Sequence, residues 1–287
     1  MPSHNLARIE LNGVEIIGYS VAGEETVVGM PQLDVCFDIG KAPDQLIHIN
    51  NVLLTHGHMD HSAGFAYYLS QRKFTGQSAG TILAPKNLLG PMQKIIDAWG
   101  LLDGNKIPAN LVGMKPGDEH QIKPNLFARA FPTKHSKGSL GFSVIEKRRK
   151  LKAEYTGLTG PQIVELKKQG IEIDYPLDIP IVSYLGDTQY VDFSQLDYIA
   201  KSRILIAECT FYEGEHIGRA EAGKHMHIDE LAMLLGSMQN EHIIITHTTQ
   251  RTAMHEIRKM LKEAMPGEIH DKITILPRRP GNRPDLQ

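Results

Sequence analysis

The sequence predicts an α/β fold (α+β in some schemes) with helices outside packed sheets, and three observations indicate it. Short apolar runs rich in β-branched residues have the length of buried strands. Amphipathic stretches with helical spacing lie between them, so strands and helices alternate along the chain. Two further blocks have the pattern of hairpin strands without helices, which fits sheets packed beneath helical layers.

The expected elements follow in chain order. Hairpin strands are predicted at 7–11 with 14–19, and at 126–131 with 141–146. Buried strands are predicted at 34–39, 52–54, 181–185, 204–207 and 243–245. Helices are predicted at 87–102, 160–168, 228–238 and 251–264. Every predicted buried strand is followed by polar residues, which indicates a site along the edge of a sheet.

Composition sets the broad class of the protein. The 287 residues are 41% hydrophobic, which is enough for one domain over 1–287, with an irregular proline-rich tail at 277–287. No window approaches the roughly 20 apolar residues of a membrane span, and the N-terminus lacks the pattern of a signal peptide, so we expect a cytoplasmic protein. Cys36 and Cys209 lie inside apolar runs and are expected to be core residues rather than a disulfide.

Four potential metal ligands lie within six residues directly after the strand predicted at 52–54. The run is His56-Gly57-His58-Met59-Asp60-His61. A sharp turn can direct His56 and His58 to one metal, and Asp60 and His61 to a second, whereas a solvated turn has no need of this combination. Imidazole mixed with carboxylate suits zinc best, with manganese or iron possible.

These six residues match the HxHxDH signature, so the chain resembles the metallo-β-lactamase superfamily. The resemblance implies a four-layer αββα fold, in which two packed mixed sheets have helices outside. It also implies three further ligands: His135 for the first metal, Asp187 as the bridging carboxylate and His247 for the second metal. Two metals about 3.5–4 Å apart share a water and lower its pKa to about 7, which makes hydroxide available for hydrolysis. Asp60 is then the expected general base or orienter of that nucleophile.

Four secondary motifs resemble ribonuclease Z, the endonuclease that removes the 3′ trailer of precursor transfer RNA. They are Thr133-Lys134-His135-Ser136 with Gly138-Ser139-Leu140-Gly141-Phe142, then Gly186-Asp187-Thr188, Ala207-Glu208-Cys209-Thr210-Phe211 and Thr246-His247-Thr248-Thr249-Gln250-Arg251. The resemblance implies that Glu208 acts with a later histidine to protonate the leaving oxygen, after attack by a metal-bridging hydroxide. We favour His225 over His227, because His227 directly precedes a predicted helix start.

Substrate contacts are expected at a basic cluster and at one further arginine. Lys147, Arg148, Arg149 and Lys150 form the one dense run of cations. Their position resembles the ribonuclease Z insertion, which would be an arm over about 147–178 that grips transfer RNA through its phosphates. A solvated hairpin tip is the alternative. Arg251 could reach a phosphate, and relatives of this type often act as homodimers.

Other readings of the same motifs stay open. The enzyme could hydrolyse a small phosphodiester of the cyclic-nucleotide type, for which the basic cluster would be irrelevant. A thioesterase or lactonase of the same fold would not need Glu208 and His225 as an acid. A module that binds metal or RNA without catalysis is the remaining alternative, although every expected ligand is present.

Overall fold

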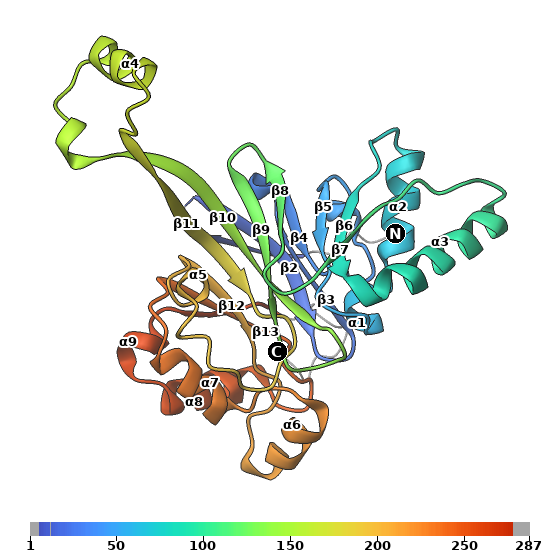
Figure 1. The fold of residues 1–287 in the computed structure, drawn as a ribbon. Coiled ribbons are helices and arrows are strands. Elements are labelled where there is room, and N and C mark those ends of the chain that lie inside the picture. Colours follow the sequence, from blue (N-terminus) through green and yellow to red (C-terminus); the bar gives the residue numbers. More distant parts are fainter. Residues whose placement is uncertain (1–5, 12, 278–287) are drawn as a thin grey trace.

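Two mixed β-sheets of seven strands each pack face to face in the computed structural model, which describes residues 6–11 and 13–277 (Figure 1). The first sheet contains β1 (Ala7–Leu11), β2 (Val14–Val21), β3 (Glu25–Met30), β4 (Val35–Phe37), β5 (Asn51–Leu53), β6 (Thr81–Pro85) and β7 (Asn110–Met114), in that order. The second contains β8 (Glu119–Lys123), β9 (Leu126–Pro132), β10 (Leu140–Leu151), β11 (Asp174–Tyr184), β12 (Ile204–Glu208), β13 (His242–Thr246) and β14 (Ile273–Ile275), also in order.

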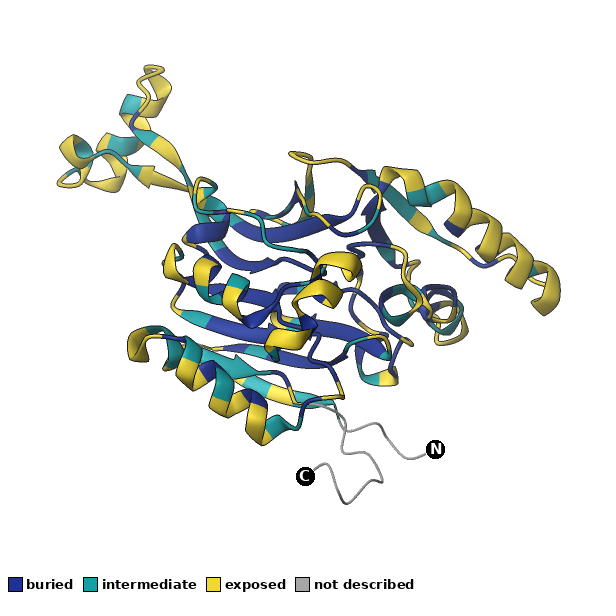
Figure 2. Ribbon diagram, turned by 90° about the horizontal axis from the view of Figure 1, so that it is seen from below, coloured by how far each residue is buried: buried dark blue, intermediate teal, exposed yellow. Residues whose placement is uncertain are grey.

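Helices cover the outer faces of both sheets, except for α4 (Gly160–Lys168), which lies at the far end of the hairpin that β10 and β11 form (Figure 1). They are α1 (Met59–Ser62), α2 (Phe65–Phe74), α3 (Leu89–Asp103), α4 (Gly160–Lys168), α5 (Asp197–Ala200), α6 (Ile217–Gly223), α7 (Ile228–Gly236), α8 (Met254–Ala264) and α9 (Gly267–His270). Figure 2 shows buried strands between helices whose outer surfaces are exposed. The four layers confirm the predicted fold class.

Three apolar clusters hold these layers together. The cluster between the sheets joins Phe37 and Leu53 of the first sheet to Phe142 and Ile206 of the second. A second cluster packs α2 and α3 against the first sheet, and a third packs α7 and α8 against the other sheet. Because both sheets are buried on their inner faces and largely covered outside, their central strands are apolar throughout, as predicted.

Most of the loops that carry the polar residues leave parallel strands of the two sheets; the loop after β9 leaves an antiparallel one. β4 to β7 pair in parallel in the first sheet, and β11 to β14 pair in parallel in the second. The expectation of a site along the edge of one sheet was therefore wrong. The strands predicted at 34–39 and 52–54 belong to the first sheet, and the other three buried strands belong to the second. The carboxyl ends of both groups lie at one common edge of the two packed sheets.

A long hairpin extends from the second sheet. β10 and β11 pair antiparallel over their full lengths, and α4 lies in the connection at the far end (Figure 1). The hairpin spans the segment predicted as an insertion, 147–178. The predicted tail, 277–287, lies outside the described residues except for Pro277. Among the described helices, none has both the length and the apolar character that crossing a membrane requires.

Candidate metal centre

The first group of polar side chains follows β5. The chain leaves this strand through Thr55 and enters α1, with His58 at the helix N-cap. His56 and His61 are buried, Asp60 is partly exposed and His58 is exposed. A short helix directly after a buried strand thus brings residues of the predicted run to one side of the loop.

The second group comes from the other sheet. His135 lies in the loop between β9 and β10, Asp187 follows β11 and His247 follows β13; all three are buried. Gly186 has a left-handed backbone (φ +62°), and a Cβ there would lie 2.8 Å from the Thr55 side chain. Only glycine fits this turn, which directs Asp187 toward the first group.

Asp187 lies at the centre of the cluster. Its Oδ2 is 3.8 Å from Nε2 of His56, 3.2 Å from Nε2 of His61 and 3.7 Å from Nε2 of His135. Nε2 of His247 lies 3.3 Å away on the other side. The remaining members pair within each half: His58 Nδ1 is 3.0 Å from His135 Nε2, and Asp60 Oδ2 is 3.4 Å from His247 Nε2.

Hydrogen bonds behind the cluster fix the rings of His56 and His61. Nδ1 of His61 donates to Asp38 at 2.7 Å. The Thr55 hydroxyl donates to the same carboxylate, so it accepts from Nδ1 of His56 at 3.0 Å. In the neutral form both rings therefore direct an unprotonated Nε2 into the cluster, the tautomer of a metal ligand held by an outer partner.

His135 and His247 are fixed in the same way. Nδ1 of His135 donates to the backbone carbonyl of Lys224 at 3.1 Å. The Thr210 hydroxyl donates to Glu208 at 2.6 Å and accepts from Nδ1 of His247 at 2.9 Å. Four histidines thus present Nε2 to one small volume.

The donor atoms fit divalent cations. His56, His58, His135 and Asp187 form one set, and Asp60, His61 and His247 form another, with the ligand atoms of each set within 4.8 Å of one another. The buried Nε2 atoms of His56 and His61 have no hydrogen-bond partner among the described residues. Orphaned imidazole nitrogens are costly in a protein interior unless a cation takes their lone pairs.

Electrostatics hold two of these ligands in the form that binds metal. Burial lowers the pKa of His56 well below its ordinary value, and the neighbouring His61 lowers it further. Burial alone would raise the pKa of Asp187, but His247 and His61 outweigh it and hold that pKa well below its usual range. Neutral imidazole and ionised carboxylate are the forms that coordinate metals.

A carboxylate and an imidazole form a pair beside the cluster. Oε1 of the fully buried Glu208 lies 2.9 Å from Nδ1 of His225 and accepts the Thr188 backbone N–H at 2.8 Å. Nδ1 of His225 is 4.0 Å from Asp187. His227 takes a different place: its Nδ1 accepts the backbone N–H of Asp229 at the start of α7.

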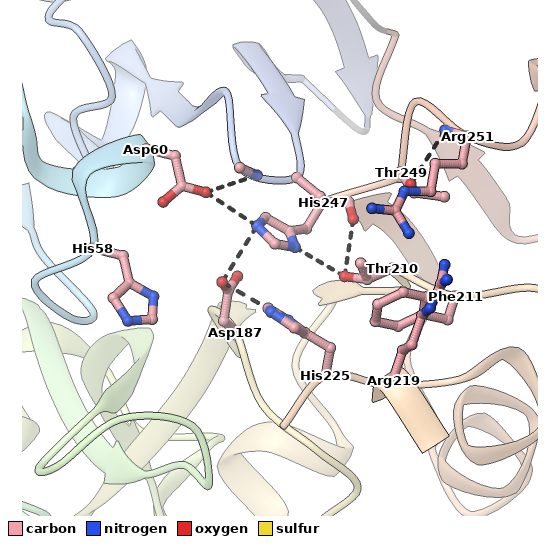
Figure 3. Close-up of a pocket in the computed structure, with 12 residues that line it drawn as sticks. His58, Asp60, Asp187, Thr210, Phe211, Arg219, His225, His247, Thr249 and Arg251 are labelled. Atoms are coloured by element: carbon pink, nitrogen blue, oxygen red, sulfur yellow. Dashed lines mark hydrogen bonds and ion pairs between the residues drawn. The ribbon is translucent and has the colours of Figure 1, made fainter. Parts of the chain in front are cut away.

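The cluster opens into a cavity of about 570 Å³. Figure 3 shows Phe211, Arg219 and Arg251 at the end of this cavity beyond His247, opposite His58. Neither guanidinium group hydrogen-bonds to or pairs with a residue in the described part of the chain. Two free cations and a half-buried aromatic ring therefore face the same space as the metal ligands.

Comparisons with known proteins give the family. A family model described as "Beta-lactamase superfamily domain" matches residues 32–248. The tRNase Z TRZ1 of Arabidopsis thaliana is 31% identical over 272 residues, which cover 93% of this chain and 96% of that protein. The chain belongs to the tRNase Z branch of the β-lactamase superfamily. This membership confirms the predicted family and a metal-dependent hydrolase.

Solved structures agree with this tRNase Z-family assignment at the level of the fold. The metallo-β-lactamase fold protein YhfI of Bacillus subtilis has a TM-score of 0.64 at 14% identity, over 91% of this chain and 94% of that one. The short form of human tRNase Z has a TM-score of 0.57 at 15% identity, over 97% of this chain and 92% of that one.

The tRNase Z-family chain brings most of the predicted site residues together. All seven predicted ligands and the Glu208–His225 pair lie in one cluster, and Arg251 lines its cavity. The predicted basic cluster lies on the β10–β11 hairpin instead, where three of its four cations are paired. Lys147 pairs with Glu119, Arg148 with Glu146, and Arg149 with Asp174; Lys150 has no partner within the described ranges.

Sequence reasoning missed several residues of this tRNase Z-family site. Asp38 lies within the strand predicted at 34–39 and was given no role, whereas it holds both His56, through Thr55, and His61. Phe211 is part of the motif that contains Glu208, but no role was predicted for it. No pattern in the sequence marks Arg219, because the placement of α6 brings this residue to the cavity.

Proposed function

We propose that this chain is a ribonuclease Z-like endonuclease that removes the 3′ trailer of precursor tRNA. The observation that carries the proposal is the Glu208–His225 pair beside a cluster of seven metal-ligand side chains. The sequence identity to a plant tRNase Z over nearly the whole chain supports the same substrate. The expected cytoplasmic location stays a prediction.

The proposed metal assignment follows the two sets of donor atoms. His56, His58, His135 and Asp187 would hold one divalent cation, and Asp60, His61 and His247 would hold the other. Asp187 would be shared by both, because its Oδ2 also lies 3.2 Å from His61 and 3.3 Å from His247. Zinc suits this mixture of imidazole and carboxylate best, with manganese or iron as alternatives. When bound, two such cations neutralise phosphate oxygens and make a water acidic enough to serve as a nucleophile.

The chain's own residues supply orientation and proton transfer. One oxygen of Asp60 is fixed by the Gly23 backbone N–H at 3.0 Å and lies beside His247, so this carboxylate can orient the attacking water or accept its proton. As the water oxygen bonds to phosphorus, the P–O bond to the leaving nucleotide breaks. His225 gives its proton to that oxygen, and Glu208 stabilises the imidazolium before transfer.

Substrate binding is proposed at two places. Arg251 with Arg219 and Phe211 suits a nucleotide at the cavity, because guanidinium groups bind phosphate and an aromatic ring stacks on a base. The β10–β11 hairpin is the proposed arm for the body of the tRNA. Its ion pairs at Arg148 and Arg149 involve exposed guanidinium groups and the pair at Lys147 is partly exposed. Solvent screens such pairs, so phosphates can replace the carboxylates.

The same ion pairs favour a second candidate function. If the hairpin cations stay paired, the enzyme is a phosphodiesterase for small substrates such as cyclic nucleotides. The cavity of about 570 Å³ is large enough for a nucleotide. Simultaneous replacement of Lys147, Arg148, Arg149 and Lys150 by alanine distinguishes the two, because only the tRNA reading predicts loss of tRNA cleavage with unchanged hydrolysis of a small diester.

A homodimer is the proposed assembly. Apolar side chains are exposed along α3, with Trp99 54%, Leu101 84% and Leu102 77% accessible. Several exposed large apolar side chains on one helix are typical of an interface, and a second copy of the chain is the simplest partner.

The deciding experiment uses the protein loaded with zinc or manganese. Precursor tRNA with a 3′ trailer and bis(p-nitrophenyl) phosphate are assayed in parallel, each with an Asp60→Ala control. Cleavage at the trailer junction that the control loses supports the proposal. Hydrolysis of the small diester alone supports the second candidate, and no turnover of either substrate contradicts both.

A further inference from the structure

Three lysines surround a second cavity next to the metal centre. This cavity of about 410 Å³ is lined by His135 together with Lys134, Lys137 and Lys224, which we call the lysine pocket. It shares no lining residue with the cavity that contains Arg219 and Arg251. Within the described residues, no carboxylate pairs with any of the three ammonium groups. His135 connects the lysine pocket to the cluster, because its Nε2 lies 3.7 Å from Asp187.

The backbone beneath two of the lysines is anchored to the site. Lys134 donates its N–H to the Thr188 hydroxyl and accepts the N–H of Gln189, both at 3.0 Å. The carbonyl of Lys137 accepts from the Asn87 side chain at 3.1 Å. The loop is therefore held on both sides while its two ammonium groups stay unpaired within the described chain, so little backbone freedom is lost when they bind an anion.

Lys224 has a backbone conformation that lysine rarely adopts. It is the C-cap of α6 with φ 54° and ψ 51°, and its carbonyl accepts the Nδ1–H of His135. Glycine at this position would end the helix and present the same carbonyl without the strain of about 1–2 kcal/mol that a side chain adds. Because glycine would suit this position better, we expect the Lys224 side chain to have a role separate from that of its backbone carbonyl.

Three lysines without a carboxylate partner among the described residues lie next to the metal centre and suit an anion beside the scissile group. We propose that the lysine pocket binds backbone phosphates of the RNA strand immediately beside the phosphodiester that is cleaved. This inference rests on the proposed endonuclease function and adds a binding site to it. Arg219 and Arg251 hold the strand at one cavity and the lysine pocket holds it at the other, so the scissile bond is fixed between two contacts.

The main test compares two substrates with one variant. Lys134→Ala, Lys137→Ala and Lys224→Gly are combined, since glycine keeps the left-handed turn at 224. The variant is assayed on precursor tRNA and on bis(p-nitrophenyl) phosphate over a range of salt concentrations. We expect KM for the tRNA to rise at least about 10-fold, and the slope of log(kcat/KM) against log salt to become shallower by about 2–3, which corresponds to three lost phosphate contacts.

The small diester reports on the metal centre alone, and its kcat/KM should change less than about 2-fold, since it has no flanking phosphates. A control that combines Lys115→Ala, Lys262→Ala and Lys272→Ala removes the same charge from exposed positions elsewhere. Equal losses on both substrates, or a salt slope that the control variant matches, would overturn the proposal.

Single variants at 224 separate binding from structure. A binding role predicts that Lys224→Arg retains the KM for tRNA and that Lys224→Gly raises it, whereas a structural role predicts that glycine performs as well as lysine. If the wild-type protein does not cleave precursor tRNA, the endonuclease proposal fails on its own. The lysine pocket is then tested by fluorescence anisotropy with a labelled single-stranded RNA, and equal affinity of the wild type and the triple variant overturns it.

Discussion

The Tyr184 hydroxyl donates a hydrogen bond of 2.8 Å to Oδ2 of Asp38, and this bond joins the two sheets behind the histidines. Asp38 follows β4 of the first sheet, whereas Tyr184 ends β11 of the second. The same Oδ2 accepts Nδ1–H of His61. Asp38 also has a left-handed backbone (φ 52°), so its position depends on these surrounding contacts.

Tyr184→Phe removes this link without changing the size of the ring. We expect the free energy of unfolding to fall by about 2 kcal/mol, because a buried bond to a charged group is lost. Metal affinity should fall about 10-fold, because the carboxylate that orients His61 is less well held. Urea unfolding and competition with a metal chelator measure the two effects. Tyr175→Phe, at an exposed position, is the control, and equal behaviour of the two variants would contradict the role of Tyr184.

Glu208 and His225 are expected to act as one proton donor. His225→Ala and Glu208→Gln should each lower kcat for tRNA cleavage by about 100- to 10,000-fold, with the double variant no worse than the more severe single one. Hydrolysis of bis(p-nitrophenyl) phosphate should be affected much less, because p-nitrophenolate leaves without a proton.

His227→Ala is the matched control for this pair. His227 caps α7, so its loss should lower the melting temperature with little effect on kcat. If His227→Ala removes activity while His225→Ala retains it, the assignment of the donor is wrong.

The Glu208 carboxylate should keep His225 charged above neutral pH. Burial alone would lower the pKa of His225, but Glu208 at 2.9 Å raises it to about 9. An NMR titration of the protein, with metal removed by chelation, should find this value in the wild type and a much lower one in Glu208→Gln. A wild-type pKa near 6.5, the ordinary value, would contradict the pairing.

The raised pKa also predicts the direction of a stability change. A charged His225 stabilises the folded chain fully below pH 6.5, its ordinary value, and that contribution is lost as the pH rises through about 9. The fall in unfolding free energy across this range should be smaller in Glu208→Gln.

Asp187 is expected to serve both metals. Asp187→Asn should therefore weaken binding at both sites, whereas His135→Ala should weaken the first site and leave the second nearly intact. Elemental analysis of purified variants gives the metal content per chain. Asp192→Asn, an exposed position in the same connection, is the control. Loss of only one metal from Asp187→Asn would exclude a bridging role.

The exposed face of α3 should control assembly. Leu101→Asp combined with Leu102→Asp places charge on two side chains that are 84% and 77% exposed, so folding should be unaffected. In sedimentation velocity we expect the wild type as a dimer and this variant as a monomer. A wild-type monomer at micromolar concentration would contradict the proposed dimer.

Much of the ligand cluster could be predicted because its residues directly follow apolar runs. The strands that precede the ligands end close to their predicted C-terminal bounds. The strands β3, β6, β7, β8 and β14 were not predicted, and β10 and β11 extend well beyond their predicted bounds. The helix α2 was not predicted. Its buried residues include Arg72, which donates hydrogen bonds to the backbone carbonyls of Ile47 and Ile49. The buried face is therefore not a simple apolar stripe.

The register between strands distant in the sequence could not be predicted, whereas the two predicted hairpins, 7–11 with 14–19 and 126–131 with 141–146, are confirmed. The ion pairs of Lys147 and Arg149 depend on how β10 aligns with its neighbours, and this register is set by the fold as a whole. No local pattern indicates that Arg219 and Arg251 line one cavity, because the placement of α6 in the fold decides it.

The ligands come from two sheets and lie far apart in the sequence, and this determines when the site can form during synthesis of the chain. Asp60 and His61 are encoded early in the chain and His247 near its end, and the second set of donor atoms needs both halves. A nascent chain on the ribosome therefore cannot complete this set until β13 has emerged and paired with β12. Under the proposed function, a cell translating this message is not exposed to the nuclease activity of unfinished copies.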